Sequence, residues 1–467
     1  MRKRMRCGIT KRILAAGALA MLAIASVGAG VSVQAKAAQT NKGVKIDRAH
    51  FPDANFRNVV AEYDENDDGV LSLKEAKKVT KLQSIQSGLN DTKNFKGIEY
   101  FTELEELDLQ FASARYLDIS KNKKLEKLIV KYSKLTKLDI SKNAKLSYVD
   151  CSKNKISSFI AGDKNRNLTY IDCSGNKIRK LNLSSLRKLA TLNCESNSLV
   201  SLVVKGNKSL KDLNCVRNRL TYLNVSNDPK LVKLECANNK LSRIFITNDK
   251  RLKTLECNSN RLTSLDIRSL ISLEALDCSY NKLSKLDVSK NTKLKKLMCG
   301  TNKISGLDIR KNTKLEYLDC SSNRLSRLDI RKNRRLNQIF CGSNKLTKLD
   351  TSNNLRLKVI SCGGNKLKKL DLSKNRRVQL LLCSNNKLTQ LKLCPNGALV
   401  QVFCFENKLS KLDISKCKKL NMVNCCGNKI GSLNITKTPD LHDIYCDATV
   451  KIIKRKSQKI NRFWGEW

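Results

Sequence analysis

The chain has 467 residues, of which 91 are lysine or arginine and 42 are aspartate or glutamate, so its formal net charge is +49. Such a charge attracts polyanions and speeds their capture. The chain has two histidines and no CxxC pair, which argues against a zinc site and against histidine-dependent catalysis. The composition therefore predicts a binding protein and not an enzyme.

Residues 1–37 have the organisation of a secretory signal. A basic segment precedes an apolar stretch at residues 13–33, and small residues follow at Ala35 and Ala37. We expect cleavage after Ala37, which removes seven basic and no acidic residues and leaves a charge of +42. An uncleaved membrane anchor is the alternative. No later segment is long and apolar enough to span a bilayer, so the protein is expected to be secreted, with wall retention through non-covalent contacts alone.

Residues 38–100 predict a small helical N-terminal cap around a calcium loop. Residues 64–75 resemble the loop of a single EF-hand, with Gly69 at the position of the sharp turn. A hard cation needs six or seven oxygen ligands and a bidentate carboxylate that closes the shell. Helices are expected on either side, at residues 54–63 and 73–82. The alternative is an acidic turn that binds no ion. The expected ligands of a structural Ca²⁺ are Asp64, Asn66, Asp68, Val70, Ser72 and Glu75.

Residues 101–446 carry a 21-residue repeat. Fourteen cysteines recur at this interval from Cys173 to Cys446, and Leu109 and Val130 occupy the same slot in earlier repeats. Each repeat reads LxxLxCxxNx followed by LxxLDVSxNxx, and apolar residues alternate within each half as in a half-buried strand. A fixed period of this length is the signature of a solenoid. We therefore expect a parallel-strand array of about 17 coils, followed by a C-terminal cap or tail at residues 447–467.

The inside of each coil is expected to hold free thiols and asparagine amides. Asparagines lie three residues behind the cysteines, from Asn154 to Asn428, where they can pair with backbone groups that a buried turn leaves without partners. Side chains in register on parallel strands are ~4.8 Å apart and point the same way, whereas disulfides prefer roughly 3.5–4.5 Å and converging vectors. The cysteines are therefore interpreted as small hydrophobic residues of a narrow core.

The repeat resembles the leucine-rich repeats of exported bacterial proteins. Residues 315–325, LEYLDCSSNRL, match the core LxxLxCxxNxL with cysteine in the third leucine slot, and residues 97–109 resemble the entry into internalin-type repeats. The resemblance implies a solenoid scaffold that binds a partner. It does not identify the partner, because the repeat length and the cysteine depart from internalins.

The residues beside the cysteine ladder are expected to point outward from the strand face. Early and middle coils place acidic residues there, among them Asp172 and Glu256, whereas later coils place apolar ones. Exposed apolar residues on neighbouring coils indicate a contact surface for a protein or glycan. Self-association or simple scatter is the alternative, since Ser361 interrupts the set. The predicted partner-binding residues are Phe340, Leu382, Phe403 and Phe405.

A second candidate surface is a row of cations that directly follow the ladder asparagines. One cation per coil costs self-repulsion unless counter-ions or a polymer lie along the row, and an exported bacterial protein would meet anionic wall polymer there. Binding would then depend steeply on salt. A solvated edge that keeps the array soluble is the alternative. Nucleic acid is disfavoured, because aromatic residues do not interleave with the row. The predicted polyanion-binding residues are Lys282, Lys303, Arg324, Lys345, Lys366, Lys387 and Lys408.

Overall fold

The structure is a computed structural model that describes residues 43–84, 88–226, 228–395 and 397–463. These residues belong to one compact unit, Lys42–Trp467. The predicted signal at residues 1–37 lies outside the described residues.

The N-terminal cap holds two short helices and a small two-stranded sheet. Helix α1 (Ala54–Ala61) begins after Asp53, whose carboxylate accepts backbone N–H groups of the first turn, and Phe56 on this helix is fully buried. Helix α2 (Leu73–Lys78) begins with a reciprocal Ser72–Glu75 capping box. Strands β1 (Val44–Lys45) and β2 (Val70–Leu71) pair antiparallel, and the 3₁₀ turn η1 (Ile98–Tyr100) leads into the first coil.

The second helix is shorter than the sequence predicted. It ends at Lys78, because the backbone of the β-branched Val79 is already extended, and residues Lys81–Gln83 form strand β3 instead of a last helical turn. Strand β3 pairs in parallel with the first coil. The cap therefore contributes a strand to the solenoid and is continuous with its sheet.

A parallel sheet of 19 strands runs the length of the described solenoid, in chain order. Seventeen of them, from β4 to β29, correspond to the 17 coils expected between Leu109 and Cys446. The strands after β3 are β4 (Glu106–Asp108), β5 (Lys127–Ile129), β7 (Tyr148–Asp150), β9 (Tyr170–Asp172), β11 (Thr191–Asn193), β13 (Asp212–Asn214), β15 (Lys233–Glu235), β17 (Thr254–Glu256), β18 (Ala275–Asp277), β19 (Lys296–Met298), β20 (Tyr317–Asp319), β21 (Gln338–Phe340), β22 (Val359–Ser361), β24 (Leu380–Leu382), β26 (Gln401–Phe403), β27 (Met422–Asn424), β29 (Asp443–Tyr445) and β31 (Asn461–Phe463).

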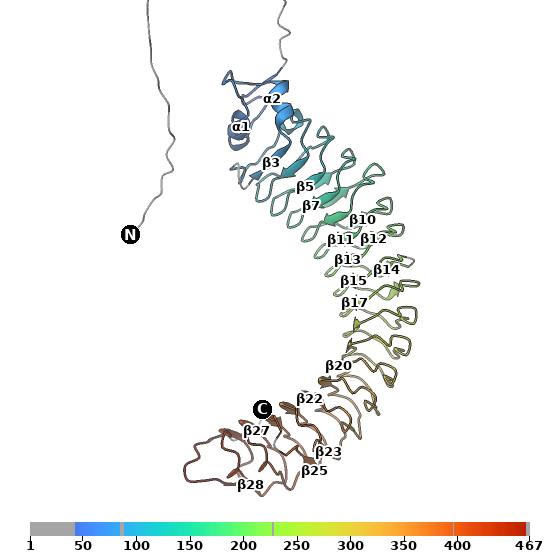
Figure 1. The fold of residues 1–467 in the computed structure, drawn as a ribbon, viewed down its shortest axis with the longest axis vertical. Coiled ribbons are helices and arrows are strands. Elements are labelled where there is room, and N and C mark those ends of the chain that lie inside the picture. Colours follow the sequence, from blue (N-terminus) through green and yellow to red (C-terminus); the bar gives the residue numbers. More distant parts are fainter. Residues whose placement is uncertain (1–42, 85–87, 227, 396, 464–467) are drawn as a thin grey trace, which may run out of the picture. The chain divides into compact units, whose positions relative to one another are not determined.

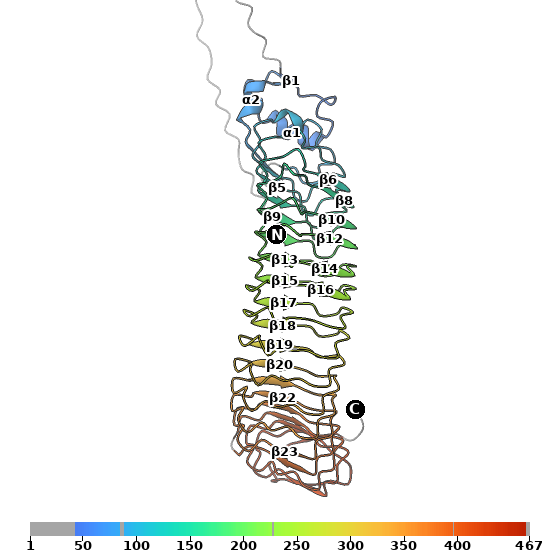
Figure 2. The same ribbon diagram turned by 90° about the vertical axis from the view of Figure 1, so that its right-hand side faces the viewer.

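The coils stack along an arc, with this sheet on the inner, concave side (Figure 1). Some coils also pair on the opposite side, which the turned view of Figure 2 shows beside the long sheet. These opposite-side pairs are β6 (Lys137–Asp139) with β8 (Ser158–Ile160), β10 (Lys180–Asn182) with β12 (Ser201–Val203), β14 (Tyr222–Asn224) with β16 (Arg243–Phe245), β23 (Lys369–Asp371) with β25 (Gln390–Lys392), and β28 (Ser432–Asn434) with β30 (Lys451–Ile453).

The core is a narrow strip between the two sides of the coils. In one coil it contains Leu276 and Cys278 from the concave side and Leu286 and Val288 from the opposite side, all buried. The ladder cysteines are buried and are free thiols, as the sequence predicted. Burial raises the pKa of their thiols, for example that of Cys362 to about 12, so the thiol form is the one that packs in the core.

Asparagine amides join neighbouring coils on both sides of the solenoid. On the concave side, Asn281 Nδ2 donates to the carbonyls of Cys257, Cys278 and Ser279 at 3.0–3.1 Å, and its Oδ1 accepts the Leu262 N–H at 2.9 Å. We call the set from Asn154 to Asn428 the strand-side ladder.

A second ladder runs through the opposite side of the coils. Asn291 Nδ2 donates to the carbonyls of Ile267 and Leu270 in the preceding coil, at 2.9 and 2.8 Å. We call the residues in this slot the opposite-side ladder. In the described residues its members are Asn122, Asn143, Asn165, Leu186, Asn207, Asp228, Asp249, Leu270, Asn291, Asn312, Asn333, Asn354, Asn375, Cys417 and Thr438.

The turn after each concave strand uses a left-handed residue. Two residues after the cysteine slot the backbone φ lies between 50° and 66°, from Phe111 to Gly427. Glycine occupies three of these positions, and side chains as large as Tyr280 and Arg217 occupy others. The turn geometry therefore holds even where the residue type does not favour it.

Candidate partner-binding surfaces

The predicted apolar residues form a column on the concave sheet. Phe340, Leu382 and Phe403 each end a strand, and strand pairing places them in the order Phe340, Ser361, Leu382, Phe403 across neighbouring coils. Phe405 follows two residues after Phe403, on the far side of the buried Cys404, and all four apolar side chains are half-exposed. The structure thus brings the four together and leaves Ser361 as the gap that the sequence indicated.

A second column, which the sequence analysis missed, fills this gap. Val359 and Leu380 are paired first residues of neighbouring strands, and Met422 holds the same position two coils further on. We define the apolar strip as the first and last strand positions Gln338, Phe340, Val359, Ser361, Leu380, Leu382, Gln401, Phe403, Met422 and Asn424. None is charged, and all but the buried Asn424 are half-exposed. The signal was available in the sequence as the residue three before each ladder cysteine.

The preceding strands carry carboxylates in the column that Phe340 continues. Glu235, Glu256 and Asp277 are in register on neighbouring strands, and Asp319 pairs directly with Phe340. Burial, and then the charges of Glu235 and Asp277, raise the pKa of Glu256. Glu235 is ion-paired with Lys233 at 2.8 Å. The last strand positions thus change between β20 and β21 from a column of carboxylates, interrupted by Met298, to uncharged residues.

The predicted basic row is exposed along its whole length. The backbone N–H of Lys282 donates to Leu262 O and that of Lys303 to Leu283 O, both at 2.8 Å, and the pattern continues to Lys408. These bonds fix the backbone of each member while the side chain remains in solvent. None of the seven cations takes part in an ion pair within the described part of the chain. Their like charges stand one coil apart, ~4.8 Å for parallel strands.

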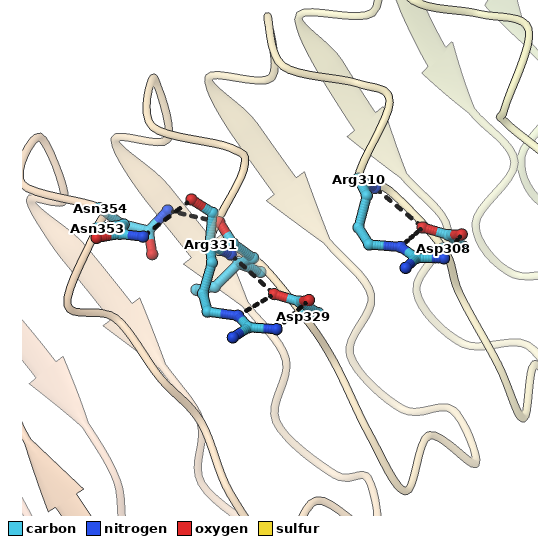
Figure 3. A network of polar contacts seen from close by, with 7 residues as sticks. Asp308, Arg310, Asp329, Arg331, Asn353 and Asn354 are labelled. Atoms are coloured by element: carbon cyan, nitrogen blue, oxygen red, sulfur yellow. Dashed lines mark hydrogen bonds and ion pairs between the residues drawn. The ribbon is translucent and has the colours of Figure 1, made fainter.

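Two arginines of the later coils are ion-paired with neighbouring aspartates. On the opposite side, Arg310 and Arg331 donate to Asp308 and Asp329 with Nη2–Oδ2 distances of 2.7 and 2.9 Å (Figure 3). The hydrogen bonds from these arginines lower the pKa of each aspartate to about 2. The opposite-side ladder runs alongside, where Asn354 donates to the carbonyls of Ile330 and Asn333. These two arginines are thus ion-paired, unlike the seven cations of the basic row.

The predicted calcium loop is closed by hydrogen bonds within itself. Asp64 Oδ2 accepts the Gly69 N–H at 2.8 Å, and Glu75 accepts the N–H groups of Glu65 and Ser72 at 2.9 and 2.8 Å. Gly69 has a φ of 73°, which the sharp turn requires. Asn66 and Asp68 bond to each other at 2.9 Å. The donor set is oxygen-rich and suits Ca²⁺, but among the described residues no three carboxylates, histidines or cysteines converge as a metal cluster.

Each of the two histidines contacts a neighbouring aspartate. His50 Nδ1 lies 2.8 Å from Asp47, and His442 Nδ1 lies 3.1 Å from Asp443. Each is thus part of a local surface pair. Within the described ranges, no helix has the length and apolarity that crossing a bilayer requires.

Comparison with known proteins identifies the architecture. No protein-family model matches the chain, and a search of the curated proteins gave no match. The functional domain of InlJ from Listeria monocytogenes, described as including a cysteine ladder, is 27% identical with a TM-score of 0.63, over 87% of this chain and 82% of that one. A leucine-rich-repeat protein of Leptospira interrogans is 25% identical with a TM-score of 0.60, over 77% and 92%.

A more distant likeness supports the fold alone. YopM from Yersinia enterocolitica is 19% identical with a TM-score of 0.53, over 88% of this chain and 94% of that one. The neighbours are internalin-like and other leucine-rich-repeat proteins, and such solenoids are typically binding scaffolds without enzymatic activity. The chain is therefore a parallel-strand leucine-rich-repeat solenoid similar to those of these bacterial proteins.

Proposed function

We propose that this protein is an exported scaffold that binds a protein or glycan partner outside the cell through its concave sheet. The observation that carries the proposal is the apolar strip, which has nine half-exposed strand positions without a charge in a chain in which 28% of residues are charged. Depletion of charge around aromatic and aliphatic side chains is the compositional mark of an interface core. The signal-like N-terminus and the internalin-like neighbours support export.

A protein surface fits this face better than a glycan does. Val359, Leu380 and Met422 offer aliphatic contacts, for which the hydroxyl-covered surface of a sugar has few partners. The carboxylates that border the strip, Asp319 first among them, would pair with basic groups at the edge of such a partner. Aromatic rings alone would suit either class.

The test removes the two phenylalanines that flank Cys404. Mature protein is cross-linked to proteins from the culture medium and cell surfaces, and each captured partner is purified and its Kd measured. Phe403→Ser/Phe405→Ser is expected to weaken binding at least about tenfold, as loss of a central anchor does. Leu355→Ser, which changes a 53% exposed side chain outside the strip, is the matched control and should leave Kd unchanged. A partner retained by both variants would contradict the proposal.

The basic row supports a second candidate function, an electrostatic tether to anionic wall polymer. Its members are exposed and lack ion pairs within the described residues, so counter-ions or a polymer must balance them. Binding to purified walls, with and without their anionic polymer, should fall steeply with salt. The triple variant Lys303→Glu/Lys345→Glu/Lys387→Glu should lose this binding, whereas reversal of Lys121, Lys142 and Lys164 changes the net charge equally and should retain most of it. Equal loss of wall binding in both variants would show that net charge, and not the basic row, is responsible for the binding.

The loop at residues 64–75 is proposed to hold a structural Ca²⁺ in the cap. Its ligands would be the side chains of Asp64, Asn66, Asp68, Ser72 and Glu75 and the Val70 carbonyl. Saturating calcium should raise the stability of the cap by about 1–3 kcal/mol if the ion is present at 10–100 times its Kd. Thermal unfolding with calcium or chelator measures this, and Glu75→Gln, which keeps the shape of the side chain, should abolish the difference. A calcium response that persists in this variant would place the ion elsewhere.

A further inference from the structure

Two slots of the opposite-side ladder hold carboxyl groups in place of amides. Asp228 and Asp249 lie in neighbouring coils, after strands β14 and β16, and are 2% and 0% exposed. Oδ1 of Asp249 accepts the Asp228 N–H at 3.0 Å. The Oδ2 atoms of both carboxyl groups are buried without a hydrogen-bond partner among the described residues. Two acidic side chains are thus stacked inside the solenoid.

An ionised carboxylate cannot do the work of the amide in this slot. In the preceding coil, Asn207 Nδ2 donates to the carbonyls of Leu183 and Leu186 at 2.8 and 2.7 Å. A carboxylate has no proton to donate, so in the same slot it would face carbonyl oxygens as a second acceptor. A protonated carboxyl has one O–H to donate and no charge to bury. The slot therefore favours the acid form of both side chains.

Among the described residues, no cation pairs with either carboxyl. The flanking slots hold Asn207 and Leu270, and the lysines that follow in the same turns, Lys230 and Lys250, are exposed and pair with neither carboxyl in the described structure. Burial raises the pKa of both carboxyls to about 7; at Asp249 the hydrogen bond from the Asp228 N–H lowers the pKa and the charge of Asp228 raises it. Burial also raises the pKa of the thiols on the concave side of the same coils, Cys215 and Cys236, so these add no charge.

We propose that Asp228 and Asp249 form a pH-sensitive joint in the solenoid, closed while both carboxyls are protonated and loosened when they ionise. A repeat array transmits stability through contacts between neighbouring coils. Loosening at this pair therefore weakens the junction between the coils before Asp228 and those after Asp249, while each part keeps its own core. This device is independent of what the concave face binds.

The direction of the pH effect follows from the raised pKa values. An aspartate in an unfolded chain has a pKa of ~3.9, so the stabilisation is fully present below ~4 and is lost as the pH rises to about 7. Within this window the equilibrium for opening increases about tenfold per pH unit for each carboxyl, and it levels off above the folded-state pKa. The joint is thus tighter at pH 5 than at pH 8.

The test restores the amides. Hydrogen exchange of the full chain, corrected for the intrinsic effect of pH, is followed by mass spectrometry at pH 5, 6.5 and 8. We expect protection of residues 218–256 in the native chain to fall at least tenfold between pH 5 and 8, while residues 290–340 change little. Asp228→Asn/Asp249→Asn should remove this difference and protect the segment at pH 8.

A transplanted pair provides the matched control. Asn312→Asp/Asn333→Asp puts the same two carboxyls into neighbouring slots where both amides now donate to two carbonyls. Protection around these residues should then become pH-dependent. The proposal is overturned if protection at residues 218–256 is independent of pH in the native chain, or if the double asparagine variant keeps the same pH response. The native chain and the restored variant decide the matter even if the transplanted variant does not fold.

Discussion

The two asparagine ladders pass through the same coils but differ in how strictly the sequence keeps them. The strand-side ladder is asparagine in every repeat from Asn154 to Asn428, whereas the opposite-side ladder also accepts aspartate, leucine, cysteine and threonine. Their hydrogen bonds explain the contrast. Asn281 Oδ1 accepts the Leu262 N–H, so this backbone group has a side-chain oxygen as its partner. The carbonyls that Asn291 reaches, those of Ile267 and Leu270, also accept backbone N–H groups at 3.0 and 3.1 Å.

The contrast between the two ladders shows which polar side chains of a repeat the fold requires. A side chain that satisfies an otherwise unpaired buried N–H cannot be replaced without leaving that group orphaned. A side chain that adds a second bond to a carbonyl already paired can be exchanged for an apolar group of similar size at small cost. Residues other than asparagine, such as Asp228 and Asp249, are consequently tolerated on the opposite side of the coil.

The largest effect is expected from the same substitution made in each ladder. Asn281→Leu orphans the Leu262 N–H and removes bonds to three carbonyls, and at about 1–3 kcal/mol per orphaned buried group it should cost at least ~3 kcal/mol. Asn312→Leu removes two bonds from carbonyls that keep backbone partners and should cost ~1 kcal/mol. Urea unfolding midpoints of the two variants measure the difference, and equal midpoints would break the comparison.

A smaller difference in the free energy of unfolding is expected between core substitutions on the two sides of a coil. Cys299 and Ile309 are both fully buried, in the concave and opposite halves of the same repeat. Cys299→Ser places a hydroxyl in the core without a designed partner and should cost about 1–3 kcal/mol. Ile309→Val removes one methyl group and should cost ~1 kcal/mol. Thermal unfolding of the two variants, with Cys299→Ala as the control for lost volume, tests the order; a stable serine variant would mean that a backbone carbonyl accepts its proton.

The smallest effect is expected where a missing amide is restored. Leu270 fills an opposite-side slot with an apolar side chain that is fully buried. Leu270→Asn exchanges that burial for two bonds to carbonyls of the preceding coil, so gain and loss nearly cancel and the change should stay within ~1 kcal/mol. A loss above ~3 kcal/mol in the unfolding midpoint would show that tolerance in this ladder depends on the individual coil.

Periodicity predicted the architecture because every coil repeats the same physical constraints. The 21-residue spacing gave the parallel strands, the inward cysteines and the exposed basic row, and the structure agrees on each. Features that break the repeat were harder. Strand β3 was taken for a helical turn, because its pairing partner lies in the first coil and not in its own sequence. The asparagine of LxxLDVSxN was visible, but its partners are carbonyls of the preceding coil, which only a three-dimensional register reveals.

The apolar strip shows the same limit. Phe340, Leu382 and Phe403 were found from their place beside the cysteines, whereas Val359 and Leu380 were missed because they precede the strand centre. The 21-residue period sets the register of Val359 and Leu380, but their exposure beside the first column is seen only in the three-dimensional structure. The calcium loop and the partner surfaces are chemical matches whose occupants must be found by experiment.

The left-handed turn after each cysteine slot makes this array unusually open to engineering. Tyr280, Thr301 and Arg217 hold φ values of 52–54° that cost an ordinary residue about 1–2 kcal/mol relative to glycine. Asparagine tolerates the same backbone, and Asn238 and Asn385 already occupy it. Because each coil touches its neighbours alone, asparagine introduced at widely spaced turns should add its increments independently. The melting temperature of the solenoid could then be raised stepwise, one turn at a time, without altering the concave face.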